Sequence, residues 1–117
     1  MADAVLHRWD DIRGQEVAPG IDRRFLTANR MTIARFQIAR GATVPIHKHD
    51  HEQVSYVVSG ALRFTVDGRE TLVRGGEALQ IPSWAEHGVV AIEDTEVIDT
   101  FSPVRQDWID GTDTYFK

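Results

Sequence analysis

The middle and C-terminal parts of the chain alternate hydrophobic and polar residues at every second position. In the first run, Ala34, Phe36 and Ile38 alternate with Ile33, Arg35 and Gln37. A period of two is typical of a half-buried β-strand. On this basis, strands are predicted at residues 31–38, 54–58, 61–66, 69–73, 78–81, 88–92 and 96–101.

Glycine-containing turns separate these runs. Asp67-Gly68 lies between two alternating runs and predicts a tight β-hairpin. Gly75-Gly76 marks another turn, and Pro82 ends a strand because proline cannot donate to the hydrogen-bond ladder. Strands of about five or six residues, with hardly any helical periodicity, predict an all-β barrel or sandwich.

The two ends of the chain are less regular. Residues 1–30 contain a turn signal and are predicted to form an N-terminal arm or edge strand, with a short helical turn near residues 5–12 as an alternative. Residues 31–117 are predicted to form the barrel and a C-terminal tail that packs Trp108 and either Tyr115 or Phe116 across it. The whole chain is expected to be one domain.

Composition narrows the function classes. A chain of 117 residues with 42% hydrophobic content suits one compact domain. The net charge of −5 argues against nucleic acid and anionic membranes as partners, and the lack of cysteine excludes thiolate chemistry. We see no export signal or membrane-spanning stretch, so a cytoplasmic protein is expected.

A cluster of histidines is the strongest chemical signal. His47, His49 and His51 are spaced by two, so in an extended chain they project from one face at roughly 6 to 7 Å intervals. The chain must turn near residues 50–52 for Gln53 to point back toward the first two histidines, and His87 is a distant candidate partner. A metal site is one interpretation; solvated surface histidines are the other.

Asp99 is unusual for its position. It shares one face of the last predicted strand with Val97 and Phe101. Because a buried charge is costly unless it is paired, Asp99 lies either at a solvated edge or turn, or against a polar cavity.

Two stretches resemble the sequence motifs of the cupin family. The first motif, G-x5-H-x-H-x3-E-x6-G, is matched with Gln53 in place of the usual glutamate. The second, G-x5-P-x-G-x2-H-x3-N, is matched with Trp84 and Ala91 in place of the usual glycine and asparagine. The resemblance implies a small jelly-roll barrel that holds one divalent metal through four residues, His47, His49, Gln53 and His87.

A narrower resemblance is to the family of the pectin-degradation protein KdgF, through residues 16–25, 47–53 and, above all, 99–105. It implies a metal-dependent enzyme that linearises 4,5-unsaturated uronates from pectin or alginate. Asp99 would then be the general base, Arg105 would hold the anionic sugar's carboxylate, and Phe101 would pack on its ring. The metal could be nickel, zinc, iron, manganese or copper.

Several alternatives stay open at this point. The protein could bind or sense a sugar without catalysis, or it could be a cupin dioxygenase, although Gln53 speaks mildly against an iron site that includes a carboxylate. His51 could be a fifth ligand, a proton shuttle or an ordinary turn residue, and the preferred interpretation is the turn residue or a supporting role beside the ligands. The outward face with Val54, Tyr56 and Val58 predicts a homodimer, unless another sheet covers it.

Overall fold

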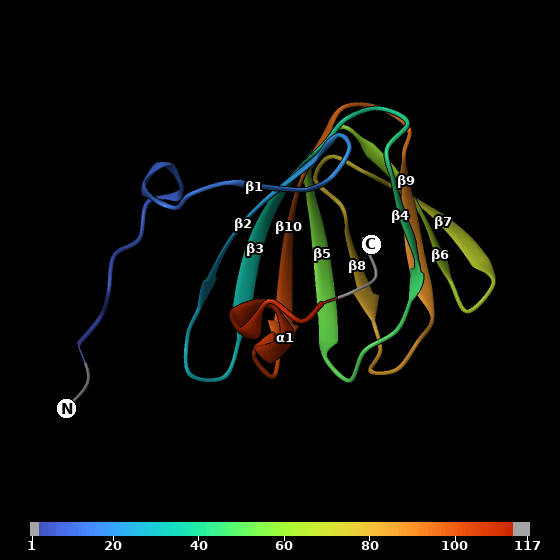
Figure 1. Ribbon diagram of the computed structural model, residues 1–117. Helices are drawn as coiled ribbons and strands as arrows, with labels where there is room; N and C mark the ends of the chain where they lie inside the picture. Colours follow the sequence, from blue (N-terminus) through green and yellow to red (C-terminus); the bar gives the residue numbers. More distant parts are fainter. Residues whose placement is uncertain (1–2, 114–117) are drawn as a thin grey trace.

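The computed structural model describes residues 3–113 as a jelly roll of two antiparallel sheets. The six-stranded sheet has the order β1-β2-β3-β10-β5-β8, and the four-stranded sheet has the order β4-β9-β6-β7 (Figure 1). The strands of the first sheet are β1 (Gln15–Ala18), β2 (Ile21–Thr27), β3 (Thr32–Ile38), β10 (Thr95–Ser102), β5 (Glu52–Ser59) and β8 (Ala78–Ile81). Those of the second are β4 (Thr43–His47), β9 (His87–Ala91), β6 (Ala61–Val66) and β7 (Arg69–Arg74).

The alternating runs of the sequence become these strands, so the predicted all-β jelly roll is confirmed. The Asp67-Gly68 hairpin joins β6 to β7, with both residues at positive φ, 47° and 82°. Positive φ at both central residues is typical of the two-residue hairpin turn, whose twist matches that of the flanking strands.

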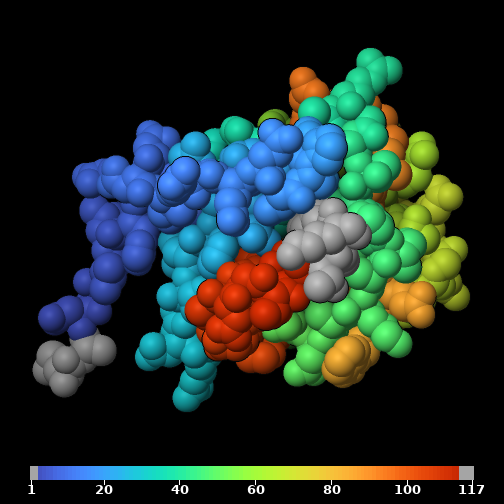
Figure 2. Space-filling model, viewed as in Figure 1, coloured from blue at the N-terminus to red at the C-terminus, as the bar shows by residue number. Residues whose placement is uncertain are grey.

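The N-terminal region contributes more to the sheet than an edge strand. η1 (Trp9–Asp11) is a single 3-10 turn, and β1 forms one edge of the sheet. β2 pairs with β3 over its whole length, from Ile21 opposite Ile38 to Thr27 opposite Thr32. Residues 3–8 extend away from the body (Figure 2).

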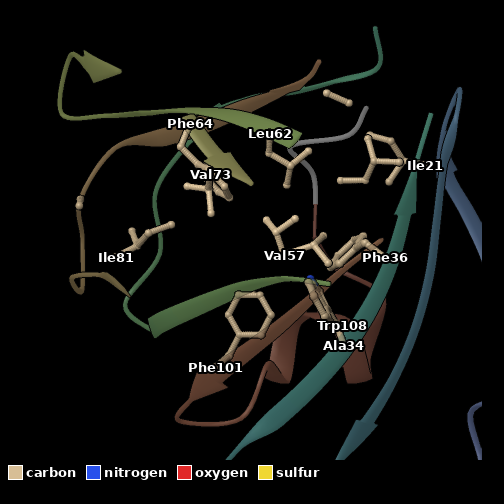
Figure 3. Packing of buried hydrophobic residues seen from close by; sticks show 14 residues of the cluster. Ile21, Ala34, Phe36, Val57, Leu62, Phe64, Val73, Ile81, Phe101 and Trp108 are labelled. Atoms are coloured by element: carbon tan, nitrogen blue, oxygen red, sulfur yellow. The ribbon is translucent and has the colours of Figure 1, made fainter. Parts of the chain in front are cut away.

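The hydrophobic core fills the space between the sheets. Its members come from both inner faces and include Ile21, Phe36, Val57, Leu62, Phe64, Val73, Ile81 and Phe101 (Figure 3). α1 (Gln106–Asp110), which periodicity did not predict, adds Trp108 to this cluster. The expected packing of Trp108 is present; Tyr115 and Phe116 lie outside the described residues.

Trp108 joins the core through its ring contacts. Its ring centroid lies 5.3 Å from that of Phe25, 6.0 Å from Phe36 and 5.0 Å from Phe101. α1 therefore anchors the segment after β10 to the barrel. Within residues 3–113, no helix has the length and apolar character needed to cross a membrane.

Candidate metal centre

An irregularity in β4 aims His47 into the barrel. Val44 pairs with Val89 and His47 pairs with His87, so Pro45 and Ile46 lie opposite Gly88 alone. β4 therefore has one more residue than β9 at this point, which is a β-bulge. The residues after the bulge face the opposite side from the one they would face in a regular strand. Val44 and His47 can therefore both line the cavity, although their spacing of three would place them on opposite faces of a regular strand.

The other two histidines reach the same place from different elements. His49 lies in the connection between β4 and β5, and His87 is the first residue of β9. The His47 and His87 rings are 4.4 Å apart, and the His49 and His87 rings are 4.8 Å apart. The sequence-predicted turn before Gln53 occupies residues 48–51, so the run of three histidines is not one extended strand.

Backbone carbonyls fix the tautomers of the three rings. The Nδ1 of His47 is 2.7 Å from the Pro45 oxygen, that of His49 is 3.1 Å from the His51 oxygen, and that of His87 is 2.8 Å from the Ala85 oxygen. Since a carbonyl only accepts, each Nδ1 must carry the proton and donate it. Each Nε2 then holds a lone pair, the form that ligates a metal.

Burial keeps these imidazoles neutral. It lowers the pKa of His47 to about 4, against the raising effect of the hydrogen bond to Pro45. Burial, followed by the charge of Arg105, lowers the pKa of His49 to about 3. Burial likewise lowers the pKa of His87 below its ordinary value. Neutral imidazole is the ligand form near pH 7, so no proton needs to leave before a metal binds.

The geometry of the triad fits a divalent ion. The ligand atoms of His47, His49 and His87 all lie within 4.8 Å of one another, close to the about 4 Å that two metal–nitrogen bonds of about 2.1 Å can span. Among the described residues, the Nε2 atoms of His49 and His87 are buried without a hydrogen-bond partner. Buried polar nitrogens without partners are costly, and a metal would satisfy both of them.

Gln53 and Asp99 form a polar pair on the facing wall. Gln53, at the start of β5, is buried, and its Nε2 donates to Ser55 Oγ at 3.0 Å and to Asp99 Oδ2 at 3.4 Å. Asp99 on β10 lies opposite Ser55 in the sheet, and both Gln53 and Asp99 line the same cavity as His47 and His87. Asp99 therefore faces a cavity with polar groups in its wall rather than a solvated edge, the second of the two alternatives drawn from the strand pattern.

Burial has a strong effect on Asp99. It raises the pKa of the carboxyl to about 6, although hydrogen bonding by Ser55 and the charge of Arg105 oppose the rise. Among the described residues, Asp99 Oδ1 is buried without a partner. A carboxyl that titrates near neutral pH in a cavity is a candidate proton acceptor.

Arg105 lies under the same cavity and is held from several sides. Its side chain is only 1% exposed, and its Nε and Nη2 donate to the two carboxylate oxygens of Asp107 at 3.0 and 2.8 Å. Its guanidinium lies 4.7 Å from the Phe101 ring centroid and 4.3 Å from that of Trp108. Burial alone would raise the pKa of Asp107, but the hydrogen bond and charge of Arg105 outweigh it and lower that pKa.

His51 lies beside the triad in a different bonding state. Its ring is 5.2 Å from that of His49, and its Nε2 donates to the Val104 carbonyl at 3.1 Å. His51 therefore ties the β4–β5 connection to the segment that carries Arg105. This contact favours a supporting role for His51 over an ordinary turn residue.

The structure thus brings together all seven residues that the resemblance implied, and it adds two more. Ser55 contacts Gln53, and Asp107 holds Arg105. The inward facing of Ser55 follows from its spacing of two from Gln53, so strand periodicity could have identified it. Nothing in the sequence pattern signals Asp107, whose contact depends on the turn into α1.

The cavity enclosed by these residues is small. Its volume is about 40 Å³, and apolar side chains such as Phe36, Leu62, Phe64 and Val97 line its inner part. A buried water needs at least about 10 to 15 Å³ of such volume, so the cavity holds about three waters. An ion fits within it, and a larger ligand must extend beyond it.

Comparisons with known proteins agree with this geometry. Residues 34–101 match the model of the cupin domain family. The pectin degradation protein KdgF of Dickeya dadantii is 34% identical over 103 residues, which cover 86% of this chain and 94% of that protein.

Solved structures extend the likeness to the fold. KdgF from a Halomonas species superposes with a TM-score of 0.85 at 33% identity, over 91% of this chain and 99% of that one. An RmlC-like cupin from Shewanella frigidimarina superposes with a TM-score of 0.84 at 29% identity, over 91% and 96% of the two chains. The chain therefore belongs to the cupin family, and within that family it is similar to the pectin degradation protein KdgF.

Proposed function

We propose that this protein is a metal-dependent enzyme that linearises 4,5-unsaturated uronates, the anionic sugars released from pectin or alginate. The observation that carries the proposal is the pairing of two unlike groups across one cavity. Three neutral histidine nitrogens converge on one side, and a carboxyl with a pKa near 6 lies on the other. The similarity to proteins named for pectin degradation supports the choice of substrate.

His47, His49, His87 and Gln53 are the residues that would hold the ion. Because Gln53 Nε2 donates to Ser55 and Asp99, its carbonyl oxygen is the atom available as a ligand. A divalent ion bound by four neutral ligands keeps its full charge, and so acts as a Lewis acid toward an anionic ligand. Nickel, zinc, iron, manganese and copper all suit a histidine-rich set.

Asp99 would move the proton. As a general base, it takes the proton from the hydroxyl on C1, after which the bond between C1 and the ring oxygen breaks and C1 becomes an aldehyde. The electron pair of that bond goes to the ring oxygen and forms an enolate. Asp99 then returns the proton to C4, which gives the linear 5-keto acid. No atom is gained or lost, and a base with a pKa of about 6 suits both transfers near neutral pH.

Arg105 and Phe101 would position the sugar. Arg105 supplies positive charge next to the cavity, and Asp107 fixes the plane of its guanidinium through two hydrogen bonds. A fixed guanidinium favours contact with a carboxylate. Phe101 offers a buried aromatic surface beside Arg105.

The test is to follow the ultraviolet absorbance of the conjugated C4–C5 double bond of an unsaturated uronate monomer. We expect loss of absorbance faster than the spontaneous ring opening, and we expect chelation to abolish the difference. Asp99→Asn should keep its metal by elemental analysis and lose at least about 100-fold in kcat, because general base catalysis contributes on this scale. A wild-type rate equal to the spontaneous rate would overturn the proposal, and saturable binding without turnover would instead indicate a sugar-binding protein.

A further inference from the structure

Trp84 has a backbone conformation that a tryptophan rarely adopts. It lies in the connection between β8 and β9 with φ of 66°, in the left-handed region. In this region the Cβ of an L-residue crowds the backbone, so glycine or asparagine is preferred. The second cupin motif has glycine at this position. Strained residues persist where their surroundings hold them, and they concentrate at functional sites.

The strained residue is held against the metal centre. Its backbone N–H donates to the carbonyl of His49 at 2.9 Å, and the neighbouring Ser83 Oγ donates to Asp50 Oδ1 at 3.2 Å. These contacts join the β8–β9 connection to the β4–β5 connection. Both connections lie at the lower end of the barrel in Figure 1, where β4 ends at His47 and β9 begins at His87.

The indole ring of Trp84 is exposed to solvent. The side chain of Trp84 is 59% exposed, whereas Trp108 is buried in the core. The core therefore does not explain why a large aromatic ring stands at this strained position. An exposed aromatic ring beside a binding site is a surface on which a ligand can pack.

The size of the cavity leaves part of the substrate outside it. About 40 Å³ holds about three waters, whereas a six-membered uronate ring with its carboxylate is several times larger. His47 and His49 are only half-buried, so the barrel end at which they lie is open. The β8–β9 connection, which carries Trp84 and is hydrogen-bonded to His49, lies at the same end of the barrel (Figure 1).

We propose that Trp84 is a substrate-contacting residue: an aromatic platform at the barrel mouth on which the C–H face of the uronate ring packs. The inference rests on the uronate class in the proposed function, and it adds a second contact surface outside the cavity. The face of an indole carries negative charge density and disfavours an anion. Packing on Trp84 therefore also orients the sugar, with its carboxylate directed inward toward Arg105.

The first measurement compares Trp84→Gly and Trp84→Asn with the wild type. Both substitutions remove the ring and suit a positive φ, so they should fold, and Trp84→Gly should raise the midpoint of thermal unfolding. We expect KM for the unsaturated uronate to rise about tenfold, with kcat changed by less than about threefold, because the lost contact is remote from the reacting bond. Metal content should not change.

The second measurement needs no turnover. Saturated galacturonate, which cannot react, should quench the intrinsic fluorescence of the wild type, and this change should be lost in Trp84→Gly. Trp9→Phe is the matched control, since it removes a tryptophan from η1 and should leave both the quenching and KM unchanged. Trp84→Phe keeps an aromatic ring and should retain at least about half of the affinity that Trp84→Gly loses.

The outcomes separate the two proposals. If the wild type turns over the uronate and Trp84→Gly has the same KM, the platform is wrong and the proposed function stands. If no uronate is turned over but galacturonate quenches Trp84, the function is wrong and the platform stands. If no uronate reacts or binds, both are wrong. A loss of metal, or a change of oligomeric state with KM unaltered, would assign Trp84 a structural role and overturn the platform.

Discussion

Asp99 is the residue at which burial and chemistry are most closely linked. Its carboxyl lies in the cavity, with one oxygen near the Gln53 amide and the other buried without a partner among the described residues. Burial raises its pKa from an ordinary 3.8 to about 6. A difference of this size corresponds to about 3 kcal/mol between the two protonation states.

This shift predicts how Asp99→Asn changes the pH dependence of stability in the metal-free protein. Because the folded pKa is raised, the folded state binds the proton more tightly, and ionisation destabilises it as pH rises from about 4 to about 6. Asn cannot ionise, so the free energy of unfolding of Asp99→Asn minus that of the wild type should increase by about 3 kcal/mol across this window. The measurement is denaturant unfolding at half-unit steps from pH 3.5 to 8.

The difference curve also cancels the histidines, which act in the opposite direction. The lowered pKa values of His47 and His49 remove stability from both proteins as pH falls below about 6.5. Only the Asp99 contribution differs between the two proteins. A difference that stays constant from pH 4 to pH 7 would contradict the raised pKa.

The sequence predicted which residues meet at the site better than it predicted their chemical state. The spacing of His47 and His49 left a metal site as one of two interpretations, and the resemblance to the cupin motifs then implied that His87 and Gln53 complete it. The tautomers were not predictable, because the carbonyls of Pro45, His51 and Ala85 that fix them are backbone groups without a residue signature. The metal-ligand role of Gln53 stays a prediction.

Among the elements, the β4–β9 pair determines where two of the three histidines lie. The bulge at Pro45 and Ile46 crosses Gly88 so closely that a Cβ on Gly88 would be 2.8 Å from the Val44 oxygen and 2.9 Å from Ile46 Cδ1. Glycine is therefore required there by close approach of the backbone, and the bulge depends on it.

Gly88→Ala should push β4 away from β9. Overpacking of this kind costs roughly 1 to 3 kcal/mol of unfolding free energy. Because His47 and His87 are on the two displaced strands, metal affinity should also fall, by about tenfold if the histidine spacing opens as the contact requires. Denaturant unfolding and metal titration by calorimetry are the measurements.

Val90→Ala is the matched control for this prediction. It changes an exposed residue two positions along the same strand, and should cost less than about 1 kcal/mol with unchanged metal affinity. Equal metal affinity in Gly88→Ala and the wild type would show that the bulge does not position His47.

β2 and α1 were hard to predict from the sequence, and each has a physical reason. The alternating pattern of β2 is weak because Arg23 occupies an inward position. Its guanidinium contacts Gln15, Asp113 and the ring of Trp108. Asp113 and Trp108 are distant in sequence from Arg23, so the inward position of a charged residue is not explained until the fold is known. α1 has only five residues, too few for a helical period to appear.

For the whole molecule, the outer face of the six-stranded sheet is the surface that the fold leaves uncovered. Val54, Tyr56 and Val58 are 41%, 45% and 40% exposed, so no other sheet within residues 3–113 covers this face. Beside Tyr56 lies Ile98, and on the same face the Arg35 and Glu96 side chains form an ion pair, so these two charges offset each other.

The N-terminal arm also carries exposed apolar residues. Val5 and Leu6 are 71% and 78% exposed on a segment that projects from the body (Figure 1). Exposure of two apolar side chains to water is unfavourable. Packing of the arm on another molecule would bury them. A second copy of this chain supplies both a sheet face with exposed apolar residues and an arm.

We therefore expect a homodimer joined through the outer sheet face around Tyr56, with each copy presenting the same patch about a twofold axis. Tyr56→Glu places a charge at the centre of that patch, so light scattering should give a monomer mass where the wild type gives twice that mass. Leu72→Glu is the matched control, because Leu72 is 39% exposed on β7 of the other sheet and its substitution should leave the dimer intact. A monomeric wild type at tens of micromolar, or a Tyr56→Glu protein that stays dimeric, would show that this face is not the interface.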